Sequence, residues 1–346
     1  MKIQCFSSFT FSYLNRARML FASLRKFHPD WELVALITDE PPPEYAFRPE
    51  CEPFDRLVYA SELGIDNFGA WVFRHNVVEA CTAVKGPFMH RACSGEADAI
   101  IYLDPDTCVF GSLDPLISML ESADIILTPH TLSPETERVA IIENEISPLK
   151  HGTYNLGFCA IRTKGEGKRF ARWWSDRLLE FCYDDPAAGL FVDQKWCDMV
   201  PALFDNVKIL RDPGYNVASW NLSKREVAIH HDGSITVNGS PLRFWHFTKA
   251  GPTADAMTKR YAQGNFPVYE IWNWYNRNLS EATDAAIPEH YWAYASYDDG
   301  TPIQRHHRVK YRENAQLQEL FPDPFTTDAG SYFRWLVDEG VLEKLD

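Results

Sequence analysis

The chain has 346 residues, 45% of them hydrophobic, so it can bury one large core and carry a smaller appendage. Its formal net charge of −14 argues against general affinity for nucleic acid phosphates. The N-terminus opens as a strand without a long apolar leader, and no run reaches the ~18 apolar residues of a membrane span. The eight cysteines show no metal spacing. The composition therefore predicts a cytoplasmic globular protein with reduced, structural cysteines.

The N-terminal segment has the alternation typical of a parallel α/β sheet. Residues 2–6 predict a strand, residues 13–27 an amphipathic helix, and residues 32–38 a second strand. Ligands of such sheets bind beyond the C-terminal ends of the strands, so the loops at 7–12 and 38–40 are candidate nucleotide contacts. The Gly-rich phosphate motifs G-x-G-x-x-G and G-x-x-x-x-G-K-S/T are absent. Phosphate would therefore be held by a metal ion and side chains.

The segment before residue 94 predicts mostly helix. A short strand is expected at residues 57–59, and residues 70–93 predict two helices separated at Gly86 and Pro87. Arg74 and Lys85 lie on these helices. They are either solvated charges or cations that face a diphosphate at the sheet edge.

Two carboxylates follow a strongly apolar strand predicted at residues 99–103. Asp104 and Asp106 lie one residue apart, so period-two geometry puts both on the same side of the chain, and Pro105 stiffens the pair. Two anionic oxygen ligands at a strand end suit Mg²⁺ or Mn²⁺ that also holds a diphosphate. A bare Asp-x-Asp is more often part of a loop or a helix cap, so the metal-site interpretation depends on the apolar strand before it and on the matching segments elsewhere.

Two further strands are expected at residues 124–128, which end before His130, and at residues 154–162. The second of these contains Asn155 and Gly157 near its start. Glycine weakens a strand unless a ligand or another backbone comes close, and the alternative is a β-bulge.

The remaining segments add a possible third metal ligand. A helix predicted from residue 191 presents Asp193 and Gln194 in its first turn, where acidic residues often only complement the helix dipole. Residues 242–252 predict an aromatic strand that carries His246 and then Lys249 to a Gly-Pro turn. His246 is either a core histidine or the missing ligand of the Asp pair.

Five segments in this order resemble the GT-A nucleotide-sugar glycosyltransferases, and in particular the bacterial relatives of the retaining, glycogenin-like family. These segments are residues 6–18, 101–106 (Ile-Tyr-Leu-Asp-Pro-Asp), 154–157 (Tyr-Asn-Leu-Gly), 192–194 (Val-Asp-Gln) and 244–247 (Phe-Trp-His-Phe). The resemblance implies an α/β fold with a mostly parallel central sheet flanked by helices. It implies a catalytic domain over residues 1–250 and a mainly helical, aromatic extension over residues 251–346.

The resemblance also implies a reaction and its site. A sugar would move with retention from a nucleoside-diphosphate sugar, UDP-hexose by family habit, to a glycan, lipid-linked or protein acceptor, as in polysaccharide biosynthesis. Asp104, Asp106 and His246 would bind Mn²⁺ or Mg²⁺. Residues expected at the nucleotide and diphosphate are Ser7, Phe9, Arg16, Asp39, Arg74, Lys85, Asp104, Lys249 and Gly251. Residues expected at the sugar are His130, Asn155 and Gly157, with Asp193 and Gln194 near the reacting carbon.

Two alternatives remain open at this stage. The segment 103–107 also fits the Asp-x-Asp-x-Thr motif of haloacid-dehalogenase-like phosphohydrolases, in which Asp104 would be phosphorylated and Asp106 would act as general acid. That class also needs a later Gly-Asp-x-x-x-Asp segment, which is absent. The second alternative is a catalytically silent sugar-nucleotide binder, for which Asp193 would be dispensable. A lipid-linked acceptor would allow peripheral membrane contact, although no basic amphipathic helix is predicted.

Overall fold

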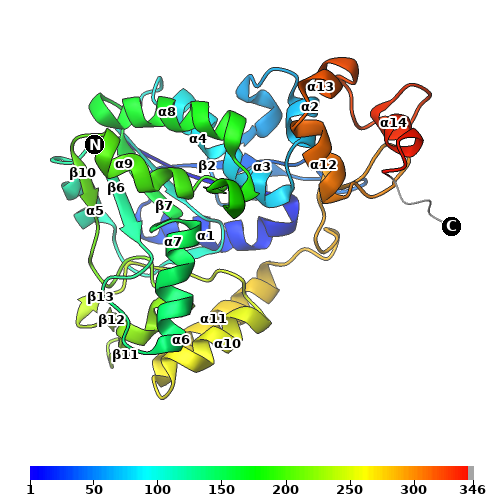
Figure 1. Cartoon of the computed structure of the whole chain (residues 1–346). Helices are drawn as coiled ribbons and strands as arrows, with labels where there is room; N and C mark the ends of the chain where they lie inside the picture. The colour runs from blue at the N-terminus through cyan, green and yellow to red at the C-terminus, as the bar shows by residue number, and fades with distance from the viewer. Residues whose placement is uncertain (342–346) are drawn as a thin grey trace.

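A seven-stranded sheet forms the centre of the computed structural model, which describes residues 1–341 (Figure 1). Its strands lie in the order β10 (Val207–Ile209), β6 (Ile125–Pro129), β7 (Tyr154–Arg162), β4 (Ala99–Leu103), β1 (Ile3–Phe9), β2 (Glu32–Ile37) and β3 (Arg56–Tyr59). β7 runs antiparallel to both β4 and β6, and the other neighbouring pairs are parallel. The predicted mostly parallel sheet is therefore confirmed.

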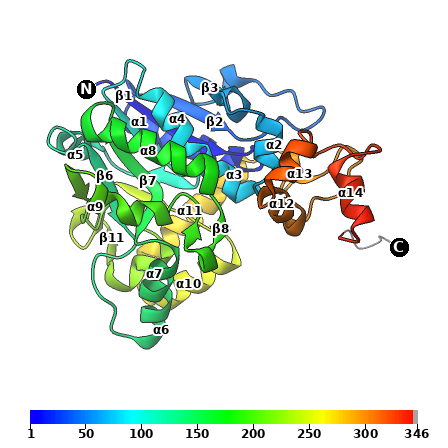
Figure 2. The same cartoon turned by 45° about the horizontal axis from the view of Figure 1, so that its top comes forward.

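Helices cover both faces of this sheet (Figures 1 and 2). One face carries α2 (Phe68–Phe73), α3 (Val77–Ala83), α4 (Lys85–Ala92) and α8 (Gly165–Phe181). The other face carries α1 (Leu14–Phe27) and α5 (Asp114–Met119). Because side chains alternate along a strand, β4 sends Ile100 and Tyr102 into the first core and Ile101 and Leu103 into the second. This two-sided burial explains why the strand is apolar throughout.

Smaller elements complete the fold around the central sheet. β5 (Thr107–Val109) pairs with β14 (Phe244–His246), and β11 (Val227–Ile229), β12 (Ile235–Val237) and β13 (Ser240–Pro241) form a three-stranded sheet. The rest are β8 (Asp184–Asp185), β9 (Leu190–Phe191), α6 (Arg138–Ile141), α7 (Ser147–His151) and α9 (Val200–Leu203). A π-helix at Ile142–Ile146 joins α6 to α7.

The C-terminal part is helical, as predicted. It contains α10 (Pro252–Ala262), α11 (Phe266–Ala282), α12 (Arg305–Arg312), α13 (Ala315–Leu320) and α14 (Tyr332–Asp338). In α11, Tyr275 stacks on Phe247 with a ring separation of 3.8 Å, while α12 to α14 pack around Phe73. The extension therefore shares cores with the rest of the chain, and a domain boundary at residue 250 stays a prediction.

Three predicted boundaries were wrong. The strand expected to end at residue 6 continues to Phe9, because Ser7 and Ser8 are buried and hydrogen-bonded into the sheet despite their polarity. Gly86 and Pro87 do not separate helices but lie in the first turn of α4, where a missing proline N–H costs little. The helix expected from residue 191 begins as a 3₁₀-helix at Lys195, after the short strand β9.

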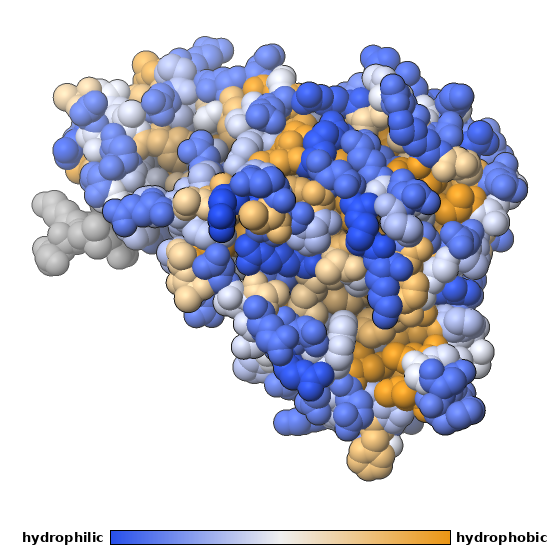
Figure 3. Space-filling view, turned by 180° about the vertical axis from the view of Figure 1, so that it is seen from behind, coloured by the Kyte–Doolittle hydropathy of each residue, from blue (hydrophilic) through white to orange (hydrophobic). Residues whose placement is uncertain are grey.

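Hydrophilic residues cover most of the back face, with apolar residues in several separate patches between them (Figure 3). Within residues 1–341, none of the helices combines the length and the apolar character that crossing a membrane would require. All eight cysteines carry free thiols, which agrees with the expectation of reduced cysteines.

Candidate metal centre

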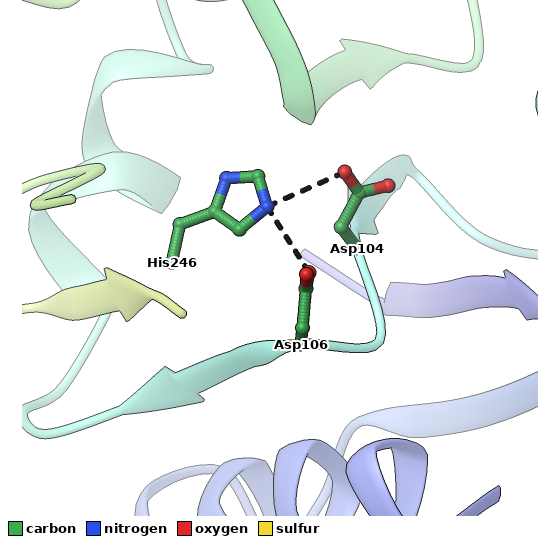
Figure 4. Close-up of side chains that lie close together, drawn as sticks. All are labelled: Asp104, Asp106 and His246. Atoms are coloured by element: carbon green, nitrogen blue, oxygen red, sulfur yellow. Dashed lines mark ion pairs between the residues drawn. The ribbon is translucent and has the colours of Figure 1, made fainter. Parts of the chain in front are cut away.

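Three potential metal ligands converge beyond the end of β4 (Figure 4). His246 Nε2 lies 3.0 Å from Asp106 Oδ1 and 3.6 Å from Asp104 Oδ2. One ligand atom from each residue lies within 4.8 Å of the other two. Asp106 and His246 are buried and Asp104 is half-buried, so the cluster opens to solvent on the side of Asp104.

Backbone pairing sets this arrangement. Asp104 N–H donates to the Gly157 carbonyl at 2.9 Å, and a turn is closed by Thr107 N–H donating to the Asp104 carbonyl at 3.0 Å. The chain then enters β5, where Thr107 lies opposite His246 of β14. The two-stranded β5–β14 ladder therefore brings together residues that are about 140 positions apart in the sequence.

The His246 ring is oriented by Asn155. Its Nδ1 lies 3.2 Å from Asn155 Oδ1, so a proton on Nδ1 leaves Nε2 directed at the two carboxylates. Gly157 makes room for the ring, because a Cβ at this position would lie 2.4 Å from His246 Cε1. The group close to Gly157 is therefore the imidazole of His246. The pairing of β7 with β6 also shifts register between Leu127 and Pro129, opposite this part of β7, so the strand shows features of both interpretations of Gly157.

This donor set fits a divalent cation. Two carboxylate oxygens and one imidazole nitrogen with a fixed tautomer are ligands that Mn²⁺ and Mg²⁺ accept. The site also contains Asp193, Lys85 and Arg16, so with a neutral His246 its three carboxylates exceed its two cations by one charge. A bound divalent ion would offset that excess.

Lys85 links the metal ligands to Asp193. Its Nζ lies 3.1 Å from Asp104 Oδ1, 3.0 Å from Asp193 Oδ2 and 3.2 Å from the Leu156 carbonyl. The ammonium group also lies 4.2 Å from the centre of the Tyr102 ring. The contacts with Asp104 and with the Leu156 carbonyl are hydrogen bonds, whereas the contact with Asp193 is an ion pair without hydrogen-bond geometry. Lys85 therefore lies between two carboxylates and is committed mainly to them.

Burial and charge shift the pKa values here. Burial raises the pKa of Asp193 to about 6, although Lys85 opposes the rise. Burial would lower the pKa of Lys85, but the charges of Asp104 and Asp193 raise it above its usual value. Burial also works against the His246–Asp106 pair. The mutual attraction nevertheless raises the pKa of His246 and lowers that of Asp106.

The predicted sugar residues surround the same edge. Gln194 Oε1 accepts from Leu156 N–H at 3.3 Å, and its Nε2 donates to the His151 carbonyl at 3.1 Å. His130 Nε2 lies 3.4 Å from Asn155 Nδ2, and burial lowers the pKa of His130 to about 4. These contacts place both side chains next to the strand that carries Asn155 and Gly157.

Three predicted nucleotide residues lie within β1, just after β2 and in the first turn of α1. The Arg16 guanidinium stacks 4.4 Å above the Tyr13 ring, and its charge helps to lower the pKa of Asp106. Asp39 accepts from Ala293 N–H at 2.7 Å, and burial raises its pKa to about 7. Ser7 is buried within β1, and its hydroxyl has no hydrogen-bond partner among the described residues.

Other predicted residues lie apart from the centre. Phe9 is 1% exposed and packs against Phe21 in the core, because β1 continues past residue 6, so its side chain does not face a ligand. Arg74 lies next to His75 and Tyr183, with no contact to the Asp pair. Lys249 is exposed with φ of 52°, and Gly251 follows it with φ of 121°. No hydrogen bond or ion pair of the Lys249 side chain occurs within residues 1–341.

The prediction missed two aromatic residues of the site. The Tyr102 hydroxyl donates to Asp104 Oδ1 at 2.5 Å. Residues two apart along a strand lie on the same face, so the position of Tyr102 two residues before Asp104 could have predicted this contact. The Trp220 ring lies edge-on to His246 at 5.6 Å. Trp220 lies in the first turn of a 3₁₀-helix, Ser219–Lys224, and no apolar periodicity in the sequence predicts its position.

The curated proteins that this chain matches in sequence are distant relatives. No protein-family model matches the chain. The chain is 27% identical over 175 residues to the uncharacterized protein YfnF of Bacillus subtilis, covering 49% of this chain and 56% of YfnF. It is 27% identical over 174 residues to YfnD of the same organism, covering 49% and 53% of the two chains. The chain thus spans about half the length of the curated relatives it matches.

Several solved glycosyltransferase structures are similar to this one. The galactosyltransferase LgtC, in complex with donor and acceptor sugar analogues, has a TM-score of 0.48 and 16% identity over 83% of this chain and 98% of LgtC. Mouse xyloside xylosyltransferase 1 has a TM-score of 0.43 and 16% identity, with 73% and 99% covered. The glycosyltransferase GlyE of Streptococcus pneumoniae has a TM-score of 0.42 and 14% identity, with 81% and 62% covered.

Proposed function

We propose that this protein is a metal-dependent glycosyltransferase that moves a sugar from a nucleoside-diphosphate sugar, with UDP-hexose as the first donor class to test. The convergence of Asp104, Asp106 and His246 at the C-terminal edge of a mostly parallel sheet carries the proposal. The order of the motif segments along the chain supports it. The acceptor class we propose is a carbohydrate, free or carried by a lipid or protein.

The triad would hold Mn²⁺ or Mg²⁺, with Asn155 keeping Nε2 of His246 available. Such an ion supplies Lewis-acid stabilisation of the negative charge on the leaving diphosphate. Arg16 is the cation of the site whose guanidinium is half-buried and not held by a carboxylate within residues 1–341. We therefore assign Arg16, and not Lys85, to the diphosphate.

Lys85 acts as a positioning residue, because its ammonium fixes Asp193 relative to the metal ligand Asp104. It also keeps Asp193 ionised near neutral pH against the effect of burial. A buried carboxylate beside the metal centre can stabilise positive charge on the anomeric carbon or attack it, and both routes are compatible with retention. We propose retention, with Asp193 as the carboxylate involved.

The test is turnover of UDP-glucose and UDP-galactose, followed as UDP release with added Mn²⁺. We expect Asp104→Asn/Asp106→Asn to lower the rate by about 100-fold or more, because Lewis-acid stabilisation is worth several kcal/mol. Asp193→Asn should also abolish turnover in an enzyme. A catalytically silent binder would show no turnover, and Asp193→Asn would leave its binding of the nucleotide sugar unchanged. Phosphatase activity on small phosphate esters that depends on Asp104, without turnover of any nucleotide sugar, would favour the phosphohydrolase alternative instead.

A further inference from the structure

A separate cavity of about 240 Å³ lies between the segment that follows β6 and the segment that joins β10 to β11. Arg211, Lys224 and Arg225 contribute three cations to its lining, and Glu135 contributes a carboxylate. None of these residues belongs to the metal centre. We call this cavity the basic pocket.

Arg225 is the buried cation of the basic pocket. Arg225 is 5% exposed, and its Nη1 donates to the Tyr215 carbonyl at 2.9 Å. In residues 1–341 its guanidinium makes no other hydrogen bond and no ion pair. Burial lowers the pKa of Arg225 to about 9, with Asp212 opposing the shift, so the side chain stays charged at neutral pH. A buried guanidinium with unused N–H groups costs free energy unless an acceptor enters the pocket.

The single lining carboxylate does not neutralise the basic pocket. Glu135 Oε1 accepts from Asn144 Nδ2 at 2.9 Å and from the Ser223 hydroxyl at 2.5 Å, so it is held by the protein. Lys224 Nζ lies 3.7 Å from Glu135 Oε2, at the long end of an ion pair. Arg211 is exposed and forms no ion pair in the part of the chain that the structure describes. The basic pocket therefore keeps an excess of positive charge.

Two residues of the 3₁₀-helix Ser219–Lys224 connect the basic pocket to the metal centre. Asn221, which lines the basic pocket, donates from Nδ2 to the His130 carbonyl at 3.3 Å. The preceding residue, Trp220, donates from Nε1 to the same carbonyl at 3.1 Å and packs edge-on against His246. A molecule in the basic pocket would thus lie next to residues that contact the metal ligands.

We propose that the basic pocket binds an acidic group of the acceptor, a carboxylate or a phosphate. The proposal rests on the proposed function, because it assigns the acceptor of that reaction. The guanidinium groups of Arg211 and Arg225 offer paired N–H donors, which match the oxygens of either anion. The volume suits one small acidic group and is below the usual range for a complete ligand site. A neutral sugar would leave the charge of the basic pocket uncompensated.

The experiment measures thermal melting of the full chain in EDTA at constant ionic strength. The probes are glucuronic acid and glucose 6-phosphate, with glucose as the matched neutral sugar and inorganic phosphate as the free anion. At about twentyfold excess over the dissociation constant, we expect the acidic sugars to raise the melting temperature by about 2–4 °C. Arg211→Gln/Lys224→Gln should abolish the rise, and both residues are exposed enough to be replaced without loss of the fold.

Asp104→Asn/Asp106→Asn serves as the second variant and should leave the rise unchanged, which keeps this result independent of the metal centre. The proposal is overturned if glucose stabilises the protein as well as the acidic sugars do, or if the rise survives in Arg211→Gln/Lys224→Gln. A rise with inorganic phosphate alone would show a site for a free anion and would overturn the assignment to the acceptor. If the acidic sugars raise the melting temperature as expected but the native chain turns over no nucleotide sugar, the proposed function is rejected instead.

Discussion

Lys85 and Asp193 form an ion pair of 3.0 Å in which each side chain is 3% exposed. The same ammonium lies 3.1 Å from Asp104 Oδ1, so one lysine connects the metal centre to the carboxylate assigned to the reaction. A buried pair of this kind contributes little net stability, because desolvation offsets the attraction. Replacing only one of the two residues is costly, because the charge of the other is then left buried and unpaired.

Replacing Lys85 by methionine should lower the free energy of unfolding by about 3–5 kcal/mol. Urea denaturation measures this loss. The matched control is Lys195→Met, because Lys195 pairs with Asp198 at 2.9 Å on the half-exposed surface. That change should cost about 1 kcal/mol or less. Equal losses in the two variants would contradict the role given to Lys85.

Gly157→Ala should damage the metal centre without unfolding the protein. The new Cβ would lie 2.4 Å from His246 Cε1, so the imidazole must move away from Asp104 and Asp106. We expect the affinity for Mn²⁺ to fall by about 10–100-fold, the usual effect of disturbing a ligand's support. Gly69→Ala is the control, because the added methyl group meets no atom closer than 4.0 Å. Unchanged Mn²⁺ binding by Gly157→Ala would show that His246 is not a ligand.

Stability should fall as the pH drops below about 6.5, in part because of His75. Burial lowers the pKa of His75 to about 3, so the folded state excludes a proton that the unfolded chain accepts. The stability is therefore complete above the unfolded pKa and is lost as the pH falls toward 3. Each such histidine contributes a slope of about 1.4 kcal/mol per pH unit.

Melting curves between pH 7 and 4 test this slope, with His75→Asn expected to flatten it. His290→Asn is the control, since the His290 side chain is 91% exposed. A slope that is identical in the protein and in His75→Asn would contradict the assignment.

A chain that ends at residue 250 should not fold stably. Such a chain loses α11, whose Tyr275 stacks on Phe247, the residue after His246. It also loses Trp272, whose ring lies 5.0 Å from that of Phe247. We expect aggregation or a melting temperature well below that of the full chain, measured by circular dichroism. A soluble fragment of residues 1–250 that still binds Mn²⁺ would support the predicted domain boundary.

The sequence predicts those parts of the fold that depend on local pattern. The apolar run of β4 and the Asp pair after it indicated both the strand and its place at a ligand-binding edge. Helix α1 was predicted within one residue of its start. These features depend on neighbouring residues only, so they are visible without tertiary structure.

Features set by distant contacts were not predictable. The antiparallel direction of β7 cannot be read from an apolar run, because parallel and antiparallel buried strands share the same pattern. Lys85 appeared as one of two candidate cations, and only packing of α4 against the sheet distinguishes it from Arg74. His246 was predicted as a ligand, whereas its support by Asn155 needed the structure.

Calorimetric titration with nucleoside diphosphates and Mn²⁺ tests the central claim most directly. The ligands are UDP, GDP, CDP and dTDP, titrated into the native chain and into Asp104→Asn/Asp106→Asn, each with Mn²⁺ or with EDTA. We predict micromolar binding of one nucleotide, UDP in the first instance, that requires Mn²⁺ and disappears in the double variant. Binding that is equally tight in EDTA, or that survives in the double variant, would contradict the account of Asp104, Asp106 and His246 as a metal centre for a nucleotide sugar.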